Sequence, residues 1–384
     1  MKPMHWTFCI LMFSSSFMSN SQQTDYEKWK EQRLQSYESF SAAYLQRYQD
    51  FKQKVEQHWG SGSEISGQDF YVSYSEDLSK KTVIDFAANE IRVEVLVDEN
   101  SSTTDQLEQQ AFQLVKQSIS QISSADPLLQ GANSQDSRTL AETLVPGLKP
   151  GQNIPITETK IEDVEVTNIT PSNLSPSEPA RKASNDDASS KRVKRVTISL
   201  DGKNIYQRRA LQYQDLVKNQ ARQYNLDSAL LLAIMQVESS FNPLAQSPIP
   251  AFGLMQIVPD SAGKDVNTRL FKLKRPPSAE QLFKPDDNIL FGSAYINLLQ
   301  QNYLAGITDP TSRLYCAIAA YNTGAGNVAK VFHPEKKKRI SGAVEIINTL
   351  SPEQVYQRLL TDLPYEETRK YLQKVTTAIP QYEL

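Results

Sequence analysis

One acidic residue lies at the end of an apolar segment and is followed by a glycine-containing turn. In the stretch LDSALLLAIMQVESSFNPLAQSPIPAFGLMQIVP, the residues Leu226, Leu230, Ile234 and Glu238 recur at steps of four. This spacing predicts a helix in which the Glu238 carboxyl continues an apolar ridge. Burial among apolar neighbours disfavours the ionised carboxylate and raises its pKa, as a general acid near neutral pH requires. Glu238 is therefore the candidate catalytic residue.

The helix that carries Glu238 is expected to span 228–240. A residue before proline is disfavoured in the helical region, so the Asn242-Pro243 pair predicts a loop directly after this helix. A glutamate at the edge of an apolar face can also turn toward water, and the ridge alone favours that interpretation. The motifs that follow Glu238 favour a functional site instead.

Four short motifs occur in order through the second half of the chain. They are ESSFNP from Glu238, with Ser247 nine residues after the glutamate, GLMQIVP from Gly253, AYNTGAGNV from Ala320 and LPYEETRKY from Leu363. Together they resemble the lytic transglycosylase and goose-type lysozyme superfamily, glycoside hydrolase family 23. The resemblance implies an all-α lysozyme-like (SLT) catalytic domain over 196–384 and an exported enzyme that cleaves peptidoglycan.

The resemblance also implies that Glu238 acts twice. It would protonate the oxygen of the β-1,4 bond between N-acetylmuramic acid and N-acetylglucosamine, and then take the proton of the muramic C6 hydroxyl as a 1,6-anhydro ring closes. After Glu238 no Asp or Glu follows until Asp260, and in this family the substrate's own N-acetyl carbonyl replaces the second carboxylate. A muramidase that uses water, and a non-catalytic peptidoglycan-binding protein, are the alternatives.

The motif residues around the glutamate are implied substrate-binding residues: Ser247, Gly253, Met255, Gln256, Tyr321, Asn322, Glu367 and Tyr371. Ser247 matches the family serine that helps to hold the acetamido group. Tyr321 offers a hydroxyl to Glu238 or to the reacting sugar, although a helix-end aromatic and a cap would equally explain Tyr321 and Asn322.

Glu367 and Tyr371 lie four residues apart and so share a face of the last predicted helix. By resemblance the glutamate contacts the peptide or a distal sugar and the tyrosine borders the active site, while a plain surface position is the alternative for Glu367. Gly253 lets the backbone pass close to another part of the chain or to the substrate. One departure is Pro250, where family members commonly have glycine, so the loop that holds Ser247 is expected to have a different shape.

The region before these motifs has the pattern of a small mixed α+β domain over 22–170. Aromatic residues at three- and four-residue steps predict a helix over 26–59, and we interpret this aromatic face as core packing rather than as a sugar platform. Alternating segments that begin at Asp69, Thr82, Ile91 and Lys160 predict strands, with a helix over 106–123. By the order of its segments, the region is similar to the N-terminal domain of the type C membrane-bound lytic murein transglycosylases.

A flexible linker is predicted over 171–195, because this stretch is rich in Ser, Pro, Asn, Asp and Lys and ends in KRVKR, which we place in solvent. Beyond it, the periodicity predicts helices over 206–224, 228–240, 288–302, 312–321, 341–348, 352–360 and 365–379. The predicted fold is an α+β N-terminal domain followed by an all-α lysozyme-like catalytic domain.

The chain start predicts export. One lysine, an apolar run from Trp6 to Phe17 and then small polar residues match a secretory signal peptide over 1–21. An uncleaved anchor or an unusual lipoprotein signal at Cys9 is the alternative. The expected location is the periplasm, in association with the outer membrane if the chain is anchored.

Composition limits the remaining functions. The 384 residues suffice for two domains, and a net charge of −3 gives no bias toward nucleic acid. Cys316 is predicted to be a small core residue, and the three histidines lack metal-ligand spacing, so we expect no metal and no cofactor. The expected partners are peptidoglycan glycan strands, with the outer membrane and wall-synthesis proteins as further candidates and no nucleic acid.

Overall fold

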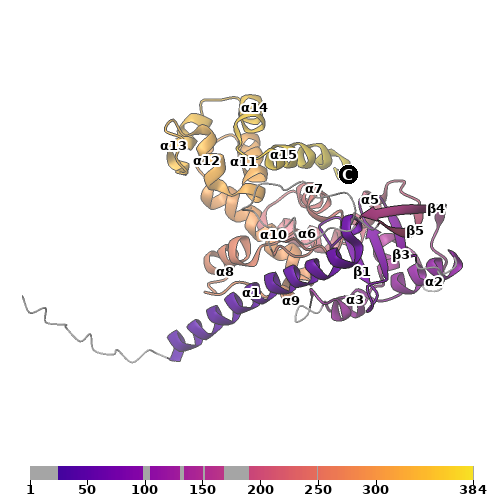
Figure 1. Ribbon diagram of the computed structural model, residues 1–384. Coiled ribbons are helices and arrows are strands. Elements are labelled where there is room, and N and C mark those ends of the chain that lie inside the picture. The colour runs from indigo at the N-terminus through magenta and orange to yellow at the C-terminus, as the bar shows by residue number, and fades with distance from the viewer. Residues whose placement is uncertain are drawn as a thin grey trace, which may run out of the picture.

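The computed structural model describes residues 25–97, 104–129, 134–149, 152–167, 190–248 and 250–383. The predicted signal peptide over 1–21 and most of the predicted linker lie outside these residues. A long helix, a sheet and shorter helices make up the N-terminal half, and a helical body follows (Figure 1).

The sheet has five antiparallel strands in the order β1-β2-β3-β5-β4. The strands are β1 (Phe70–Tyr74), β2 (Lys80–Asp85), β3 (Glu90–Leu96), β4 (Ile156–Thr167) and β5 (Ser190–Leu200). Ile91 and Val93 lie opposite Ile198 and Val196, and these buried side chains form the face that packs on the main core. The predicted strands are confirmed, although β4 begins four residues before the predicted start at Lys160.

Strand β5 corrects the predicted linker. Residues 190–195, with the KRVKR segment, form part of a strand between β3 and β4 and not a flexible linker. Val193 is buried with Trp59 and Val166 on the second face of the sheet, and Arg195 on that face pairs with the Glu94 carboxylate at 2.6 Å. The basic residues made this strand resemble a solvated linker, although Arg195 pairs with a carboxylate of the neighbouring strand β3. The domain boundary predicted between 195 and 196 was therefore wrong, since the sheet continues to residue 200.

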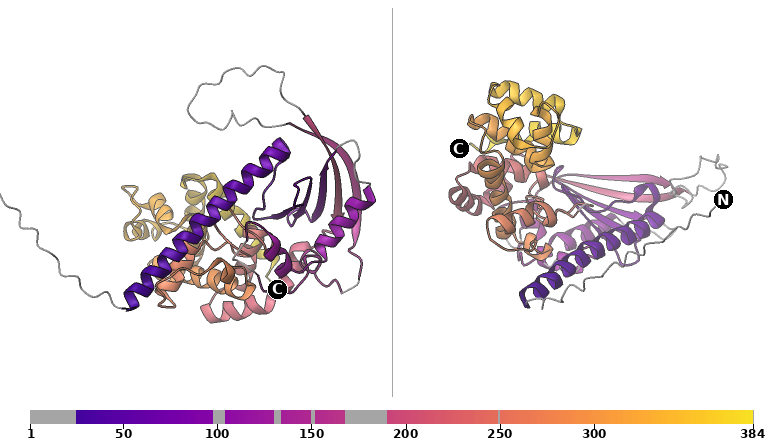
Figure 2. Two further views of the ribbon diagram at one scale, coloured as in Figure 1. Left: turned by 60° about the horizontal axis from the view of Figure 1, so that its bottom comes forward. Right: turned by 90° about the vertical axis from the view of Figure 1, so that its left-hand side faces the viewer.

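The predicted first helix is confirmed as α1 (Asp25–Trp59). Its last residue, Trp59, is buried against the sheet, and its indole nitrogen donates to the Leu78 carbonyl at 2.8 Å. From there the helix crosses to the helical body, as the views in Figures 1 and 2 agree. Tyr44 and Val55 are buried, so the core-packing interpretation holds for this part of the aromatic face.

The helix predicted over 106–123 is in fact two helices, α2 (Thr104–Val115) and α3 (Ile119–Ala125). Ser118 has an extended backbone and starts α3 with a capping box: its hydroxyl accepts the Gln121 amide hydrogen, and the Gln121 side chain accepts that of Ser118. This reciprocal pair satisfies two amide groups that helix continuation would otherwise bond, and so it starts a new helix. The short α4 (Leu140–Leu144) was not predicted.

The second half of the chain is helical, as predicted. Its helices are α5 (Ile205–Leu211), α6 (Gln214–Tyr224), α7 (Ser228–Ser239), α8 (Lys264–Arg269), α9 (Ala279–Leu282), α10 (Pro285–Leu298), α11 (Pro310–Thr323), α12 (Ala325–Phe332), α13 (Ile340–Ile347), α14 (Pro352–Asp362) and α15 (Glu366–Ala378). The helix predicted over 206–224 is two helices, α5 and α6. Helices α8, α9 and α12 were missed, because four to eight residues show too little periodicity.

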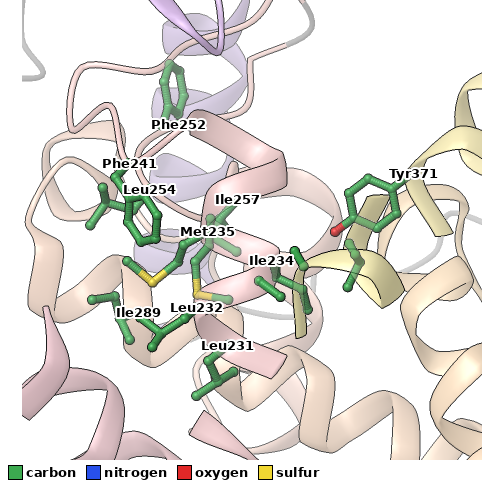
Figure 3. Packing of buried hydrophobic residues seen from close by; sticks show 14 of the residues in the cluster. Leu231, Leu232, Ile234, Met235, Phe241, Phe252, Leu254, Ile257, Ile289 and Tyr371 are labelled. Carbon is green, nitrogen blue, oxygen red and sulfur yellow. The ribbon is translucent and has the colours of Figure 1, made fainter. Parts of the chain in front are cut away.

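Helix α7 lies in the middle of the core. Leu231, Leu232, Ile234 and Met235 pack among side chains from several other segments, and Tyr371 approaches from α15 with its hydroxyl directed inward (Figure 3). A helix that is apolar nearly all round is stable only when it is buried. The thiol of Cys316 in α11 is also fully buried, which confirms its prediction as a core residue.

Candidate active site

Glu238 is the penultimate residue of α7. The helix begins where the Asp227 carboxylate caps the Ala229 amide at 2.7 Å, and it ends at Ser239. Ser240 and Phe241 then adopt the left-handed conformation, with φ of 51° and 63°. The helix therefore stops before Asn242-Pro243, and the left-handed pair rather than the proline ends it. This turn leaves Glu238 at the junction between a buried helix and a loop.

Glu238 is only 8% exposed, which excludes the interpretation that its side chain turns toward water. Burial raises its pKa to about 8, and the negative charges of Glu367 and Asp69 add to this, while the Tyr371 hydroxyl partly opposes it. Desolvation dominates because the low-dielectric surroundings penalise the ionised form. Glu238 therefore holds its proton at neutral pH, as the apolar ridge predicts.

Tyr371 and Glu367 of α15 both affect the protonation of this carboxyl. The buried Tyr371 hydroxyl is near enough to lower the pKa of Glu238, but its contact lacks full hydrogen-bond geometry, so the hydroxyl can still bond a substrate. Burial and the Glu238 charge together raise the pKa of Tyr371. Glu367 is exposed one turn earlier and acts on Glu238 through its charge alone.

Tyr321 lies near the same carboxyl, and burial and the Glu238 charge raise its pKa. Its hydroxyl donates to the Met255 carbonyl at 2.8 Å, so of the two predicted roles the bond to Glu238 is not made. The neighbouring Asn322 is not a simple helix cap, since its side-chain oxygen accepts the Thr368 hydroxyl at 2.7 Å. These two residues connect the end of α11 to the Gly253 turn and to α15.

The turn at Gly253 is built around a residue that the sequence did not indicate. Gly253 has φ of 75°, and a Cβ there would lie 2.5 Å from the Leu282 carbonyl oxygen and from the Asn288 amide nitrogen. The buried Asn288 side chain accepts the Met255 amide and donates to the Phe252 and Leu282 carbonyls, each at 2.7 Å. Glycine is thus needed for close packing on another part of the chain. Asn288 lies in no motif, and only the folded chain reveals its role.

Met255 and Gln256 contribute to the turn in different ways. The Met255 side chain is fully buried against Gly292, so only its backbone can face a substrate. Gln256 is left-handed, with φ of 46°, and its amide nitrogen donates to the Gly253 carbonyl at 3.0 Å. Its side-chain oxygen is buried with no hydrogen-bond partner in the described part of the chain, so it can accept a bond from a ligand.

Ser247 lies at the far end of the loop and is half-buried. Its hydroxyl accepts the Ala251 amide at 3.2 Å, and its own amide donates to the Ala251 carbonyl at 3.2 Å, so residues 247–251 close on themselves around Pro250. The interactions that shift the pKa of Glu238 come from Tyr371, Glu367 and Asp69, and Ser247 is not among them. Of the predicted motif residues, only Tyr371 and Glu367 are among the groups that shift the pKa of Glu238.

Replacing Asn288 with aspartate is expected to lower the free energy of unfolding by about 3 kcal/mol, because a buried carboxylate would face two carbonyl oxygens with no hydrogen to donate. The measurement is denaturant unfolding followed by circular dichroism. The exposed Asn219 on α6 is the control, since its change to aspartate should alter stability by less than about 0.5 kcal/mol. Equal unfolding midpoints for Asn288→Asp and the parent would show that Asn288 does not hold the turn.

In the described part of the chain, no three His, Cys, Asp or Glu side chains come together in a way that could bind a metal ion. Over the same residues, no helix has both the length and the apolar character needed to span a membrane.

Two family models match separate parts of the chain. Residues 215–343 match the "Transglycosylase SLT domain", and residues 37–115 match "Membrane-bound lytic murein transglycosylase C, N-terminal domain". The first match covers Glu238 and the Gly253 and Ala320 motifs, and the second runs from within α1 to the end of α2. The predicted family resemblance is confirmed for both parts.

Curated relatives match at higher identity over one half of the chain. Over 190 residues the chain is 49% identical to the membrane-bound lytic murein transglycosylase C of Yersinia pestis (strain Pestoides F) and to that of Yersinia pseudotuberculosis (serotype O:1b, strain IP 31758). Each match covers 49% of this chain and 51% of the relative, so the chain spans about half the length of the curated relatives it matches.

Solved structures match over a smaller share. The 70 kDa soluble lytic transglycosylase of Escherichia coli is 24% identical, with a TM-score of 0.35, over 46% of this chain and 25% of that one. An inactive mutant of the lytic transglycosylase Slt of Pseudomonas aeruginosa is 26% identical, with a TM-score of 0.33, over 47% of this chain and 25% of that one.

Proposed function

We propose that this chain, whose residues 215–343 belong to the transglycosylase SLT domain family, is a lytic murein transglycosylase that acts on peptidoglycan. The observation that carries the proposal is Glu238: a buried carboxyl at the end of α7 whose pKa of about 8 keeps it protonated at neutral pH. Such a group can give a proton to a poor leaving oxygen. The names of the curated relatives support the same substrate class.

In the first step, Glu238 protonates the glycosidic oxygen between N-acetylmuramic acid and N-acetylglucosamine. The bond from the anomeric carbon to that oxygen breaks, and the N-acetylglucosamine side leaves as an alcohol. Positive charge develops on the muramic anomeric carbon, where the substrate's own acetamido carbonyl would take the place of a second carboxylate. Removal of a proton from Glu238 leaves a carboxylate in a buried site, where its charge is poorly solvated.

In the second step, that carboxylate takes a proton back. A buried carboxylate with a high pKa is a comparatively strong base, so Glu238 is suited to accept the hydrogen of the muramic C6 hydroxyl. The C6 oxygen then bonds to the anomeric carbon and closes the 1,6-anhydro ring. Glu238 ends the cycle protonated, and no water is consumed.

The other motif residues would orient the sugar for these steps. The Tyr371 hydroxyl and the unpaired Gln256 oxygen offer a donor and an acceptor beside the glutamate and the turn. Tyr321 would act indirectly, because its hydroxyl holds the Met255 carbonyl. Ser247 would contact the acetamido group and Glu367 the peptide or a distal sugar, so both are expected to affect KM more than kcat.

Mass analysis of the products tests the reaction. The full chain is incubated with purified sacculi and the released muropeptides are identified. Anhydro-muropeptides are the expected products, and they are lighter by one water than hydrolysis products. Products carrying that water would identify a muramidase, while binding to sacculi without release would identify a wall-binding protein.

The pH dependence of cleavage is expected to have its descending limb near pH 8. The first step requires protonated Glu238, whose pKa is about 8, so kcat/KM should fall as the pH rises through that value. Below pH 8 Glu238 stays protonated, so its titration does not increase kcat/KM further as the pH falls. Initial rates of muropeptide release between pH 5 and pH 10 provide the measurement. A descending limb near pH 5 would contradict the assignment of Glu238 as a buried acid.

We also propose that the chain is exported and works at a membrane. The proposal follows from the signal peptide predicted over 1–21 and from the word membrane-bound in the names of the relatives. Fractionation of cells that express the full chain tests it, with detection in the periplasmic or outer-membrane fraction expected and detection only in the cytoplasm as the contrary result.

A further inference from the structure

The backbone after Glu238 is strained. Ser240 and Phe241 both have positive φ although neither is glycine. Each such residue costs about 1–2 kcal/mol, and the conformation persists only where neighbouring groups hold it. Phe241 is buried, with its ring stacked on Tyr213 at 6.2 Å. The contacts that hold Ser240 come from another part of the chain.

The loop before β1 supplies the first of these contacts. The Asp69 carboxylate accepts the Ser240 hydroxyl at 2.8 Å, and the Asp69 carbonyl accepts the Phe86 amide at 2.8 Å, which fixes Asp69 to the end of β2. The preceding residues continue along the same segment: the Gln68 carbonyl accepts the Asn242 side chain at 3.1 Å and the Gly67 carbonyl accepts the Gln246 amide at 3.3 Å. Residues 67–69 therefore lie alongside residues 240–246 and are hydrogen-bonded to them at three positions.

Arg209 of α5 fixes the same turn from the other side. Its guanidinium is buried and donates to the Ser240 carbonyl at 3.3 Å, to the Asn89 side chain at 2.8 Å and to the Phe86 carbonyl. A buried arginine with several acceptors is held in one position, because releasing any of them would leave a polar group unpaired. The end of β2 and the end of α7 are thus joined through one side chain.

Helix α1 contacts the far end of this segment. The Tyr44 hydroxyl donates to the Gln246 side chain at 3.1 Å, and the Ser247 carbonyl lies 3.3 Å from the same hydroxyl. The Tyr44 ring packs edge-on against Phe252, with centroids 5.5 Å apart. Because α1 is anchored on the sheet by Trp59, it connects the sheet half to the loop that carries Ser247.

We propose that the N-terminal half is a structural part of the active site, with Asp69 and Tyr44 as positioning residues that hold the two ends of 240–247 and so place Glu238 and Ser247. The inference rests on the proposed function. It adds two residues that lie outside the SLT-domain match and that bond the segment 240–247.

The negative charge of Asp69 distinguishes a positioning role from a role in packing alone, because only the charge affects the pKa of Glu238. The groups that face Glu238 are Asp69, Tyr371 and Glu367 of α15, and Tyr321 of α11. Asp69 in turn faces Ser240, Lys374 and Asp85, and burial raises its own pKa. Its negative charge raises the pKa of Glu238, so removal of the charge should lower it. Asparagine at this position keeps an oxygen that can accept the Ser240 hydroxyl and loses the charge, whereas alanine loses both.

The first experiment compares Asp69→Asn and Asp69→Ala with the full parent chain on sacculi. Asp69→Asn is expected to keep kcat within about twofold at pH 6 while its descending limb moves to lower pH. Asp69→Ala is expected to lower kcat about tenfold, because the carboxyl of Glu238 is no longer held in place. Asp163→Asn, an exposed change on β4, is the matched control and should leave both quantities unchanged. Parent-like kcat and pH profile in both Asp69 variants would overturn the role of Asp69.

The second experiment removes the Tyr44 hydroxyl. Tyr44→Phe is expected to raise KM about fivefold with little change in kcat, because it loosens the loop that carries Ser247 and not α7. Tyr48→Phe is the control one turn along the same helix, where the hydroxyl makes no hydrogen bond among the described residues. An unchanged KM in Tyr44→Phe would overturn the role of Tyr44.

Amide hydrogen exchange over 240–247 provides a readout that needs no activity. Faster exchange is expected in Asp69→Ala at residues 240–242 and in Tyr44→Phe at residues 246–247, with the controls unchanged. Unchanged exchange in both variants would overturn the inference even if the parent released no muropeptides. An inactive parent with the expected exchange would instead count against the proposed function alone.

Discussion

Replacing Glu238 with glutamine is expected to lower the rate of muropeptide release by about 10⁴-fold, to near background. Positioned general acid–base catalysis typically contributes between about 10² and 10⁴, and here one residue would serve in both proton transfers. Glutamine matches the shape of the protonated side chain, so substrate binding should be retained. The measurement is the initial rate of release from sacculi, with the products identified by mass.

Folding of the Glu238→Gln variant can be checked by measuring its free energy of unfolding as a function of pH. Because the pKa of Glu238 is raised from 4.5 to about 8 in the folded chain, its contribution to stability is fully present below pH 4.5 and is lost progressively as the pH rises from 4.5 through about 8. Glu238→Gln has no ionisable carboxyl at this position, so its free energy of unfolding should increase relative to that of the parent as the pH rises through this interval. Glu366→Gln is the control, an exposed glutamate on α15 paired with Lys370. Parent-like release by Glu238→Gln would remove Glu238 from the mechanism.

Replacing Gly253 with alanine is expected to lower the free energy of unfolding by about 3 kcal/mol, the largest loss we expect from adding a single methyl group in this chain. Two effects combine. A positive φ of 75° is unfavourable for alanine, and its Cβ would lie 2.5 Å from the Leu282 carbonyl oxygen and from the Asn288 amide nitrogen. Relief of that contact requires the turn and α10 to separate, which would also displace the Met255 carbonyl and Gln256. Denaturant unfolding gives the loss.

Gly147→Ala separates the two effects. Gly147 also has positive φ, 87°, but no atom lies within 4 Å of an added Cβ. Its change to alanine should cost only the backbone part, about 1 kcal/mol. Equal losses for the two variants would show that the close approach to Asn288 contributes nothing. A larger loss in Gly253→Ala than in Gly147→Ala, together with a reduced rate of muropeptide release, would tie the packing of this turn to the site.

The contacts on 240–247 change the expected role of the N-terminal half. Its sequence shows no partner, and its similarity to a family domain leaves open whether it binds other wall proteins. In the structure, Asp69 and Tyr44 bond the segment that follows Glu238, and Arg209 joins the Ser240 carbonyl to that of Phe86. Removal of this half would expose a strained turn. We therefore expect the catalytic half alone to cleave sacculi less well than the full chain.

Local patterns predicted much of the fold. The ridge from Leu226 to Glu238 required only the helical repeat, and it correctly indicated α7, while the motifs after Glu238 were needed to favour a functional carboxyl over one that turns toward water. Strands β1, β2 and β3 followed from alternation. The patterns gave wrong predictions at two places. At Ser118 a capping box divides the predicted helix into two, and in β5 a segment rich in basic residues was predicted to be a linker.

The sequence by itself determined the catalytic candidate, the motif positions, the order of the main elements and the family resemblance. Each of these depends on residue types within a few turns of helix or one strand, or on motifs whose order is visible along the chain. Only the tertiary structure decided what holds these residues in place. Asn288 bonds the turn 33 residues before it, Asp69 bonds Ser240 across 171 residues and Tyr44 bonds Gln246 across 202. Hydrogen bonds over such separations leave no periodic trace in a sequence, because their geometry exists only once the chain has folded.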